Sequence, residues 1–253
     1  MSVDRNYFEQ NYHELPAWTC PKCGRGHLIL DKKTLQNLET GPSKLMKDHD
    51  AWEPEWMESR FCAILVCNSV KCGELAAISG SVFVEEAHEQ DYNGSWNQSY
   101  VDLYEPRSLF PAPLPFQLFD EIPDVVKDRL VEAAGLIWQN SEASANQIRQ
   151  AVESLMDCRK VKKTRIQSGK RVRMSLHGRI KEFEKTDKDN AELLLAVKWL
   201  GNSGSHPGGL DRDNVLDAFD MIEMVLTNLY NKSATAIRRK AKAINKAKGP
   251  TTS

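Results

Sequence analysis

Two short segments, each carrying a pair of cysteines and ending in glycine, constrain the fold of this chain more than any other feature. The first reads CPKCG at residues 20–24 and the second reads CNSVKCG at residues 67–73. Four thiolates brought together from two tight turns match the tetrahedral, sulfur-rich coordination that structural zinc prefers. We therefore predict one Zn2+ ion bound by Cys20, Cys23, Cys67 and Cys72. Because four protein ligands leave no open coordination position, this zinc is expected to be structural rather than catalytic.

Three other residues compete with this assignment. Cys62 lies in the alternating run FCAILVC at residues 61–67, which predicts a strand and a buried thiol. His27 follows the first cysteine pair closely enough to replace one cysteine as a ligand. Cys158 lies in a helical pattern and is expected to be a core residue. The alternative without metal is a set of unrelated buried thiols, which the paired spacing disfavours.

The size and composition of the chain are those of a globular protein without a membrane segment. Its 253 residues suffice for one large or two modest domains, and no stretch approaches the roughly 20 apolar residues of a membrane span. The first sixteen residues lack the charged-then-apolar plan of a signal peptide. We expect a cytoplasmic protein with no membrane partner, in which six cysteines indicate metal or thiol chemistry rather than disulfides.

Local patterns change character near residue 104. Before it lie short β-type runs at residues 28–30, 61–67 and 75–84. The following segment carries four prolines between residues 106 and 115, which excludes a helix or a central strand.

Beyond the prolines, apolar residues recur with helical spacing in five stretches. These stretches contain Val126–Ile137, Ile148–Met156, Leu176–Phe183, Leu193–Leu200 and Val215–Leu229. The fourth helix is expected to stop at Gly201, and Asp211 or Asp213 is expected to cap the fifth. Residues after Lys232 alternate alanine with basic residues and are expected to form a frayed helix or a disordered tail.

These patterns predict an α+β protein. We expect a small zinc-stabilised, mostly β, zinc-ribbon-like domain over residues 1–104 and a proline-rich linker over residues 105–120. An all-α helical bundle is expected over residues 121–232, followed by a basic tail over residues 233–253.

Charge is distributed unevenly although the net charge is only -1. Residues 159–188 contain twelve Lys/Arg and three Asp/Glu, and residues 233–253 contain six Lys/Arg and no acid. Such clusters indicate a polyanion partner, RNA or DNA, or alternatively a merely solvated surface. The aromatic residues Trp52, Trp56, Trp96, Tyr100 and Tyr104 could stack bases or pack a thin core.

Three segments of the helical half, IRQAVE at 148–153, LHGRI at 176–180 and KWLGNSGSH at 198–206, resemble a bacterial domain family of unknown function that is related to HEPN domains. Members of this family also occur behind zinc-binding segments, and the region from Leu65 to Ala77 is similar to such a segment. The resemblance implies a HEPN-like helical bundle and a homodimer. It also implies a role in bacterial anti-phage or restriction-linked defence, with a possible partner from the same system.

HEPN ribonucleases cut RNA without metal by means of an Arg-polar-x-x-x-His run. The resemblance implies that His206 corresponds to the histidine and Asn202 to the polar residue, whereas Gly201 stands where the arginine is expected. Lys198 or Arg149 could supply the missing cation, which would stabilise charge on the phosphate. The structural alternatives are an ion pair between Arg149 and Glu153 and a histidine that only holds its loop.

These sequence features are compatible with three alternative functions. The leading one is a nucleic-acid-associated module, non-catalytic or weakly catalytic, that contacts phosphates through residues 159–188 and the tail. The second is a metal-independent endoribonuclease with Asn202 and His206 in its site. The third is a protein-interaction adaptor. P-loop, nucleophile-elbow and His-Glu-x-x-His motifs are absent from the sequence.

Overall fold

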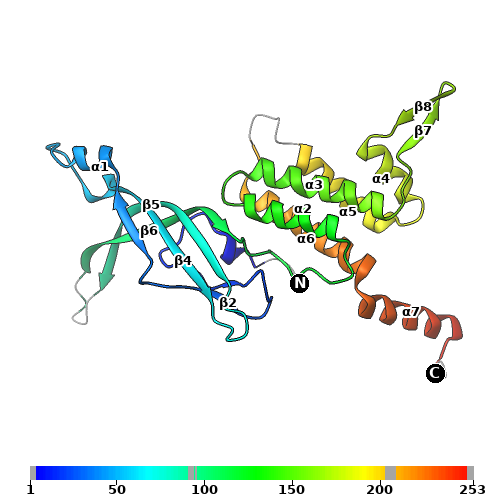
Figure 1. Cartoon of the computed structure of the whole chain (residues 1–253), viewed down its shortest axis with the longest axis horizontal. Helices are drawn as coiled ribbons and strands as arrows, with labels where there is room; N and C mark the ends of the chain where they lie inside the picture. The colour runs from blue at the N-terminus through cyan, green and yellow to red at the C-terminus, as the bar shows by residue number, and fades with distance from the viewer. Residues whose placement is uncertain (1–3, 91–93, 95, 203–208, 250–253) are drawn as a thin grey trace. The chain divides into compact units, whose positions relative to one another are not determined.

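The computed structural model describes residues 4–90, 94, 96–202 and 209–249. The chain divides into two compact units, one formed by residues 4–114 with 135–139 and the other by residues 115–134 with those from 140 onward (Figure 1). The first is a β half-barrel and the second is mostly helical, which confirms the expected α+β class. Among the described residues, no helix combines the length and the apolar character needed to cross a membrane.

Six antiparallel strands build the half-barrel. Strand β4 pairs on one side with β2 and β3 in succession and on the other side with β5, while β1 pairs with β2 and β6 pairs with β5. The strands are β1 (Trp18–Thr19), β2 (His27–Leu30), β3 (Gln36–Glu39), β4 (Glu58–Cys67), β5 (Leu75–Gln90) and β6 (Trp96–Phe110). Short helical elements are η1 (Arg5–Phe8), α1 (Gly41–Met46) and η2 (Pro54–Trp56). The three predicted β-type runs lie in β2, β4 and β5.

Side chains of β4 alternate between the core and the surface, because successive residues of a strand point to opposite faces. Phe61, Ala63, Leu65 and Cys67 are buried. Cys62 lies on the opposite face and is exposed. The expectation of a buried Cys62 thiol was therefore wrong, and the alternation that predicted the strand also separates Cys62 from Cys67.

The first part of the proline-rich segment belongs to the sheet. Residues 105–110 complete β6, which pairs with β5 on one side and forms an isolated bridge with Tyr12 at Tyr104 on the other. Pro106 is tolerated there because it pairs with Gly80 where the register shifts. A Cβ atom at Gly80 would lie 2.0 Å from the carbonyl oxygen of Glu105, so only glycine permits this close approach.

All five predicted helices form in the second unit, and a sixth follows them. They are α2 (Asp124–Leu136), α3 (Ser141–Cys158), α4 (Leu176–Glu184), α5 (Lys188–Asn202), α6 (Arg212–Tyr230) and α7 (Lys232–Ala247). Helices α3, α5 and α6 each bury an apolar stripe, so they share one core. Asp211 caps α6 by accepting a hydrogen bond from the Asn214 N–H, as one of the two expected caps. Cys158, expected in the core, is exposed in the last turn of α3.

A β-hairpin that the sequence patterns did not predict connects α3 to α4. Strands β7 (Thr164–Gln167) and β8 (Lys170–Arg173) extend away from the helices beside them (Figure 1). Ser168 and Gly169 form the turn with φ angles of 48° and 75°, the left-handed geometry of a two-residue hairpin. The second unit is thus mostly rather than entirely helical.

Candidate functional site

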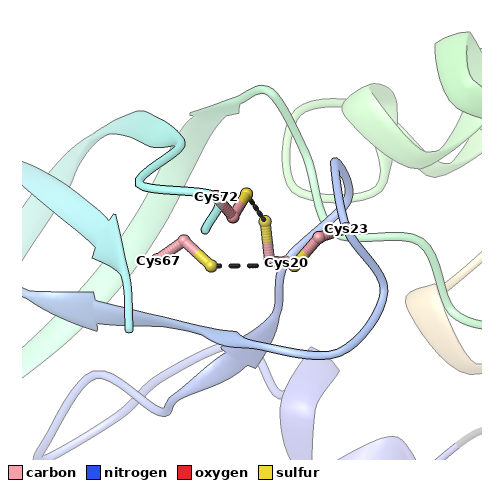
Figure 2. A group of neighbouring side chains, drawn as sticks. All are labelled: Cys20, Cys23, Cys67 and Cys72. Atoms are coloured by element: carbon pink, nitrogen blue, oxygen red, sulfur yellow. Dashed lines mark hydrogen bonds between the residues drawn. The ribbon is translucent and has the colours of Figure 1, made fainter. Parts of the chain in front are cut away.

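The four cysteines of the two paired segments converge in the N-terminal unit. Cys20 and Cys23 follow β1, Cys67 ends β4, and Cys72 lies in the turn that leads to β5. Their four Sγ atoms lie within 4.8 Å of one another. Cys20 Sγ is 3.8 Å from Cys72 Sγ, and Cys23 Sγ is 3.8 Å from Cys67 Sγ (Figure 2). The cysteines are clustered as for a metal site.

Glycines give both cysteine turns their shape. Gly24 and Gly73 each adopt a φ angle of 60°, a left-handed conformation that glycine accepts without strain. Gly26 makes room for a ligand, because a Cβ atom there would lie 2.6 Å from Cys67 Sγ. The turns are therefore built so that backbone and sulfur atoms approach closely.

The cluster divides into one acidic thiol and others that resist ionisation. Hydrogen bonds from the backbone N–H groups of Gly26 and Arg25 lower the pKa of Cys23 to about 6, and the Gly26 nitrogen lies 3.3 Å from its sulfur. Burial raises the pKa of Cys20 and of Cys67. A bound cation would offset that burial by stabilising all four thiolates, so metal binding would release protons and weaken as the pH falls.

The competing ligands lie elsewhere. His27 is exposed, and neither it nor Cys62 belongs to the cluster. Within the described parts of the chain, the four-cysteine group is the one cluster of at least three His, Cys, Asp or Glu side chains able to hold a metal ion.

Two of the residues singled out in the helical half line a common cleft. Arg149 comes from α3 and Asn202 from the end of α5, and the cleft has a volume of about 660 Å³. Asn140, Glu142 and Asn146, at the start of α3, also line it. His206, the third member of the motif, lies outside the described residues.

Arg149 and Lys198, the two candidate cations, differ in their contacts and in their burial. The Nη1 of Arg149 lies 2.6 Å from Glu153 Oε1 and its Nε donates to Asn146 Oδ1 at 3.1 Å, so the expected intrahelical ion pair is present. Lys198 is only 8% exposed, and its Nζ lies 3.1 Å from the centre of the Trp199 ring. Burial, and then the charge of Arg149, lower the pKa of Lys198. Trp199 itself is 55% exposed.

Gly201 continues α5 instead of ending it. The helix extends to Asn202, and Gly201 does not adopt the left-handed conformation expected of a helix stop. A Cβ atom at this position would lie 2.7 Å from Arg149 Cβ and 2.9 Å from the carbonyl oxygen of Ala145. The observed packing of α5 on α3 thus leaves no room for an arginine side chain at position 201.

Most of the predicted basic stretch surrounds the β7–β8 hairpin. Residues 159–181 contain ten Lys/Arg and no acid. All residues of the two strands are exposed except Thr164, which is half-buried. The hairpin is the structural element that sequence reasoning missed, although its Ser-Gly turn between two short strands was the available signal.

Acidic side chains lie near Tyr100, one of the aromatic residues considered for base stacking. Trp56, Trp96 and Tyr100 are exposed in the N-terminal unit. Partial burial raises the pKa of Tyr100, and the charges of nearby Glu55, Glu86 and Glu53 raise it further. Such a negative field opposes a phosphate backbone, so this surface is a poor candidate for nucleic acid.

Comparisons with known proteins identify two domains without assigning an activity. Residues 6–110 match the family described as Domain of unknown function (DUF8608), and residues 131–247 match the Domain of unknown function (DUF4145). No curated protein and no solved structure matches the chain. The first matched region contains the four cysteines, and the second contains the cleft and the hairpin.

We expect Cys72→Ser to lose the metal, because the three remaining thiolates leave the coordination shell open. Elemental analysis of the purified protein should fall from about one metal ion per chain to well below that value. Cys62→Ser is the matched control, since its thiol lies outside the cluster on the same unit. Equal metal content in both variants would contradict the assignment.

We expect Gly201→Ala and Gly135→Ala to change stability in opposite directions. The new methyl group at 201 meets α3, so the free energy of unfolding should fall by about 1–3 kcal/mol. No atom lies within 4 Å of a Cβ built at Gly135 in α2, so alanine should stabilise there by about 0.5–1 kcal/mol through helix propensity. Denaturation followed by circular dichroism tests both, and changes of the same sign would refute the close approach.

Proposed function

We propose that this protein binds nucleic acid through the basic hairpin formed by β7 and β8, which contacts the phosphate backbone. The observation that carries this proposal is the concentration of cations: residues 164–173 contain four Lys/Arg and no acid. Lysine and arginine that neutralise phosphates release counterions, and this supplies most of non-specific affinity.

The register of the hairpin distributes its cations over both faces. Arg165 pairs with Val172 and Gln167 with Lys170, so Arg165 and Lys170 share one face. Arg171 and Arg173 share the other. A hairpin that packed one face on a core would carry apolar residues there, whereas this one is charged on both sides. A two-stranded ribbon of this kind has the dimensions to enter a nucleic-acid groove.

Helix α7 supports the same function with a second basic surface. Arg239, Lys240, Lys242 and Lys246 are exposed on it, and residues 233–253 contain no acid. Both basic elements lie in the region that matches the second domain of unknown function. We therefore assign nucleic-acid binding to the helical unit.

We also propose that the four cysteines hold zinc in a structural role. Four sulfurs about 2.3 Å from a tetrahedral centre are about 3.8 Å apart, which agrees with the two closest sulfur–sulfur distances of 3.8 Å. An all-thiolate set also favours zinc over harder cations such as Mg2+ and Ca2+. The ion would then fix the fold of the N-terminal unit and take no part in the chemistry of the helical unit.

A second candidate function is metal-independent RNA cleavage in the cleft at the end of α5. Its support is that Arg149 and Asn202 line one cleft although they are 53 positions apart in the sequence. Because Gly201 lets α3 approach, the guanidinium of Arg149 replaces the arginine that the motif lacks. The general acid and base would be His206, whose side chain titrates near neutral pH.

We expect removal of three hairpin cations to weaken binding in a salt-dependent way. In the triple variant Arg165→Ala, Lys170→Ala, Arg171→Ala, the slope of log K against log salt should decrease in magnitude by about 2–3, because each phosphate contact contributes about 0.7–0.9. Fluorescence anisotropy with RNA and DNA oligonucleotides over a salt series measures this slope.

The control removes three cations that already have carboxylate partners. Lys127, Lys181 and Lys185 pair with Asp124, Glu184 and Glu182. Their triple alanine variant should change the slope much less than the hairpin variant. Equal effects, or no binding by the unchanged protein at low salt, would refute the proposal and favour the adaptor function.

We expect a cleaving protein to need both Arg149 and His206. If the cleft is a ribonuclease site, Arg149→Ala and His206→Ala should each lower the rate in EDTA by about 100-fold or more, the loss typical of an electrostatic or acid–base group. Lys185→Ala should leave the rate unchanged. Cleavage that persists in both variants, or that requires added Mg2+, would exclude this second function.

A further inference from the structure

We propose that the cavity at the base of the hairpin binds one phosphate group of the nucleic acid that the hairpin holds. This inference rests on the proposed function and names the contact that would anchor the strand. The cavity has a volume of about 440 Å³ and is lined by Glu153, Asp157, Lys163, Arg173, Ser175 and Arg179, among others. Since a water molecule occupies about 30 Å³ of liquid, a phosphate with part of its hydration shell fits.

Arg179 is the buried cation of this cavity. Its side chain is 9% exposed, and its Nη2 donates to Asp157 Oδ1 at 2.6 Å and to the Val161 carbonyl oxygen at 3.2 Å. Its Nε is buried and has no hydrogen-bond partner among the described residues. This nitrogen has no accessible surface and does not contact the cavity, but the charge of the guanidinium in the cavity wall favours an anionic ligand.

The N-terminus of α4 opens into the same cavity. Ser175 caps the helix, and its hydroxyl accepts a hydrogen bond from the Gly178 N–H at 3.2 Å. The N–H groups of Leu176 and His177 lie in the first turn, where no intrahelical acceptor exists. These donors and the positive end of the helix dipole favour an anion at this position.

The acidic residues of the cavity are already neutralised. Asp157 accepts from Arg179 and, at 2.7 Å, from Lys163 Nζ. Glu153 pairs with Arg149, which comes from outside the cavity lining. Arg173 has no ion-pair partner among the described side chains. The balance of these charges is therefore positive, and Arg173 is the cation available to a ligand.

The hairpin connects this cavity to the proposed nucleic-acid surface. Arg173 is the last residue of β8, and Arg171 lies two residues earlier on the same face. A strand that follows β8 would thus reach the cavity with one of its phosphates. Continuity with the hairpin favours a phosphate of a polynucleotide over a free phosphate ion, which would not need the exposed cations.

The test compares Arg173→Ala with Arg171→Ala in the full chain. Both variants remove one arginine from the same face of β8, but only Arg173 lines the cavity. At one fixed salt concentration, we expect Arg173→Ala to weaken binding of a single-stranded RNA oligonucleotide about tenfold, as for a charge-assisted hydrogen bond. Arg171→Ala should weaken it about two- to threefold, as for one screened phosphate contact.

A second variant and a competitor make the outcome specific to the cavity. Arg179→Ala removes the charge that neutralises Asp157, so the cavity becomes more negative and the affinity of this variant should also fall. Inorganic phosphate should displace RNA from the unchanged protein more than sodium chloride of equal ionic strength does, and Arg173→Ala should abolish that difference. An oligonucleotide with a 5′-phosphate that binds more tightly than its 5′-hydroxyl form would identify the terminal group as the ligand. Equal affinities would identify a backbone phosphate.

Two results would overturn the inference, and they are distinguishable. If RNA binds but Arg173→Ala and Arg171→Ala weaken it equally, the cavity holds no phosphate and the proposed nucleic-acid function stands. If the unchanged protein binds no nucleic acid at low salt, both the proposed function and this inference fail.

Discussion

The N-terminal unit depends on the convergence of four sulfur atoms within 4.8 Å of one another. Cys20 and Cys72 are 52 positions apart in the sequence, so their contact closes a long loop and fixes the turn after β1 against the turn before β5. Burial favours neutral thiols for Cys20 and Cys67, whereas backbone donors favour a thiolate at Cys23. A bound metal ion would resolve this conflict, because it would stabilise every sulfur in its charged form. Such an ion would also stabilise the pairing of the short strands β1 and β2.

The helical unit depends on a different constraint, which is the absence of a side chain at Gly201. Its neighbours on α3 are so close that even a methyl group collides with Arg149 and with the backbone of Ala145. This contact brings the guanidinium of Arg149 to the end of α5 and creates the cleft that Asn202 shares. The packing of α3 on α5 and the residues that line the cleft thus both depend on Gly201. The motif's arginine is missing at this position, and the glycine that stands there lets Arg149 come close.

Much of this architecture could be predicted from the sequence because its signals are local. The cysteine spacing, the alternation along β4 and the helical periodicity of α3 and α6 each involve residues near one another in the chain. The hairpin could not be found in this way, because its strands have only four residues each and carry few apolar side chains. The meeting of Arg149 with Asn202 depends on how two helices pack, and spacing in the sequence contains no such information.

The physical meaning of the charge pattern also became visible only in three dimensions. Counting residues treats every lysine and arginine between 159 and 188 alike, yet the structure divides them into two groups. Lys181 and Lys185 on α4 have carboxylate partners, so their fields are largely cancelled within the surface. The hairpin contains no acid, and its cations face solvent on both sides. A potential that attracts a polyanion arises from the second group alone, and β8 leads from it to the buried guanidinium of Arg179. A phosphate would therefore interact most strongly at the base of the hairpin. The partial burial there lowers the effective dielectric constant, so each charge has a larger interaction energy than at the exposed tip.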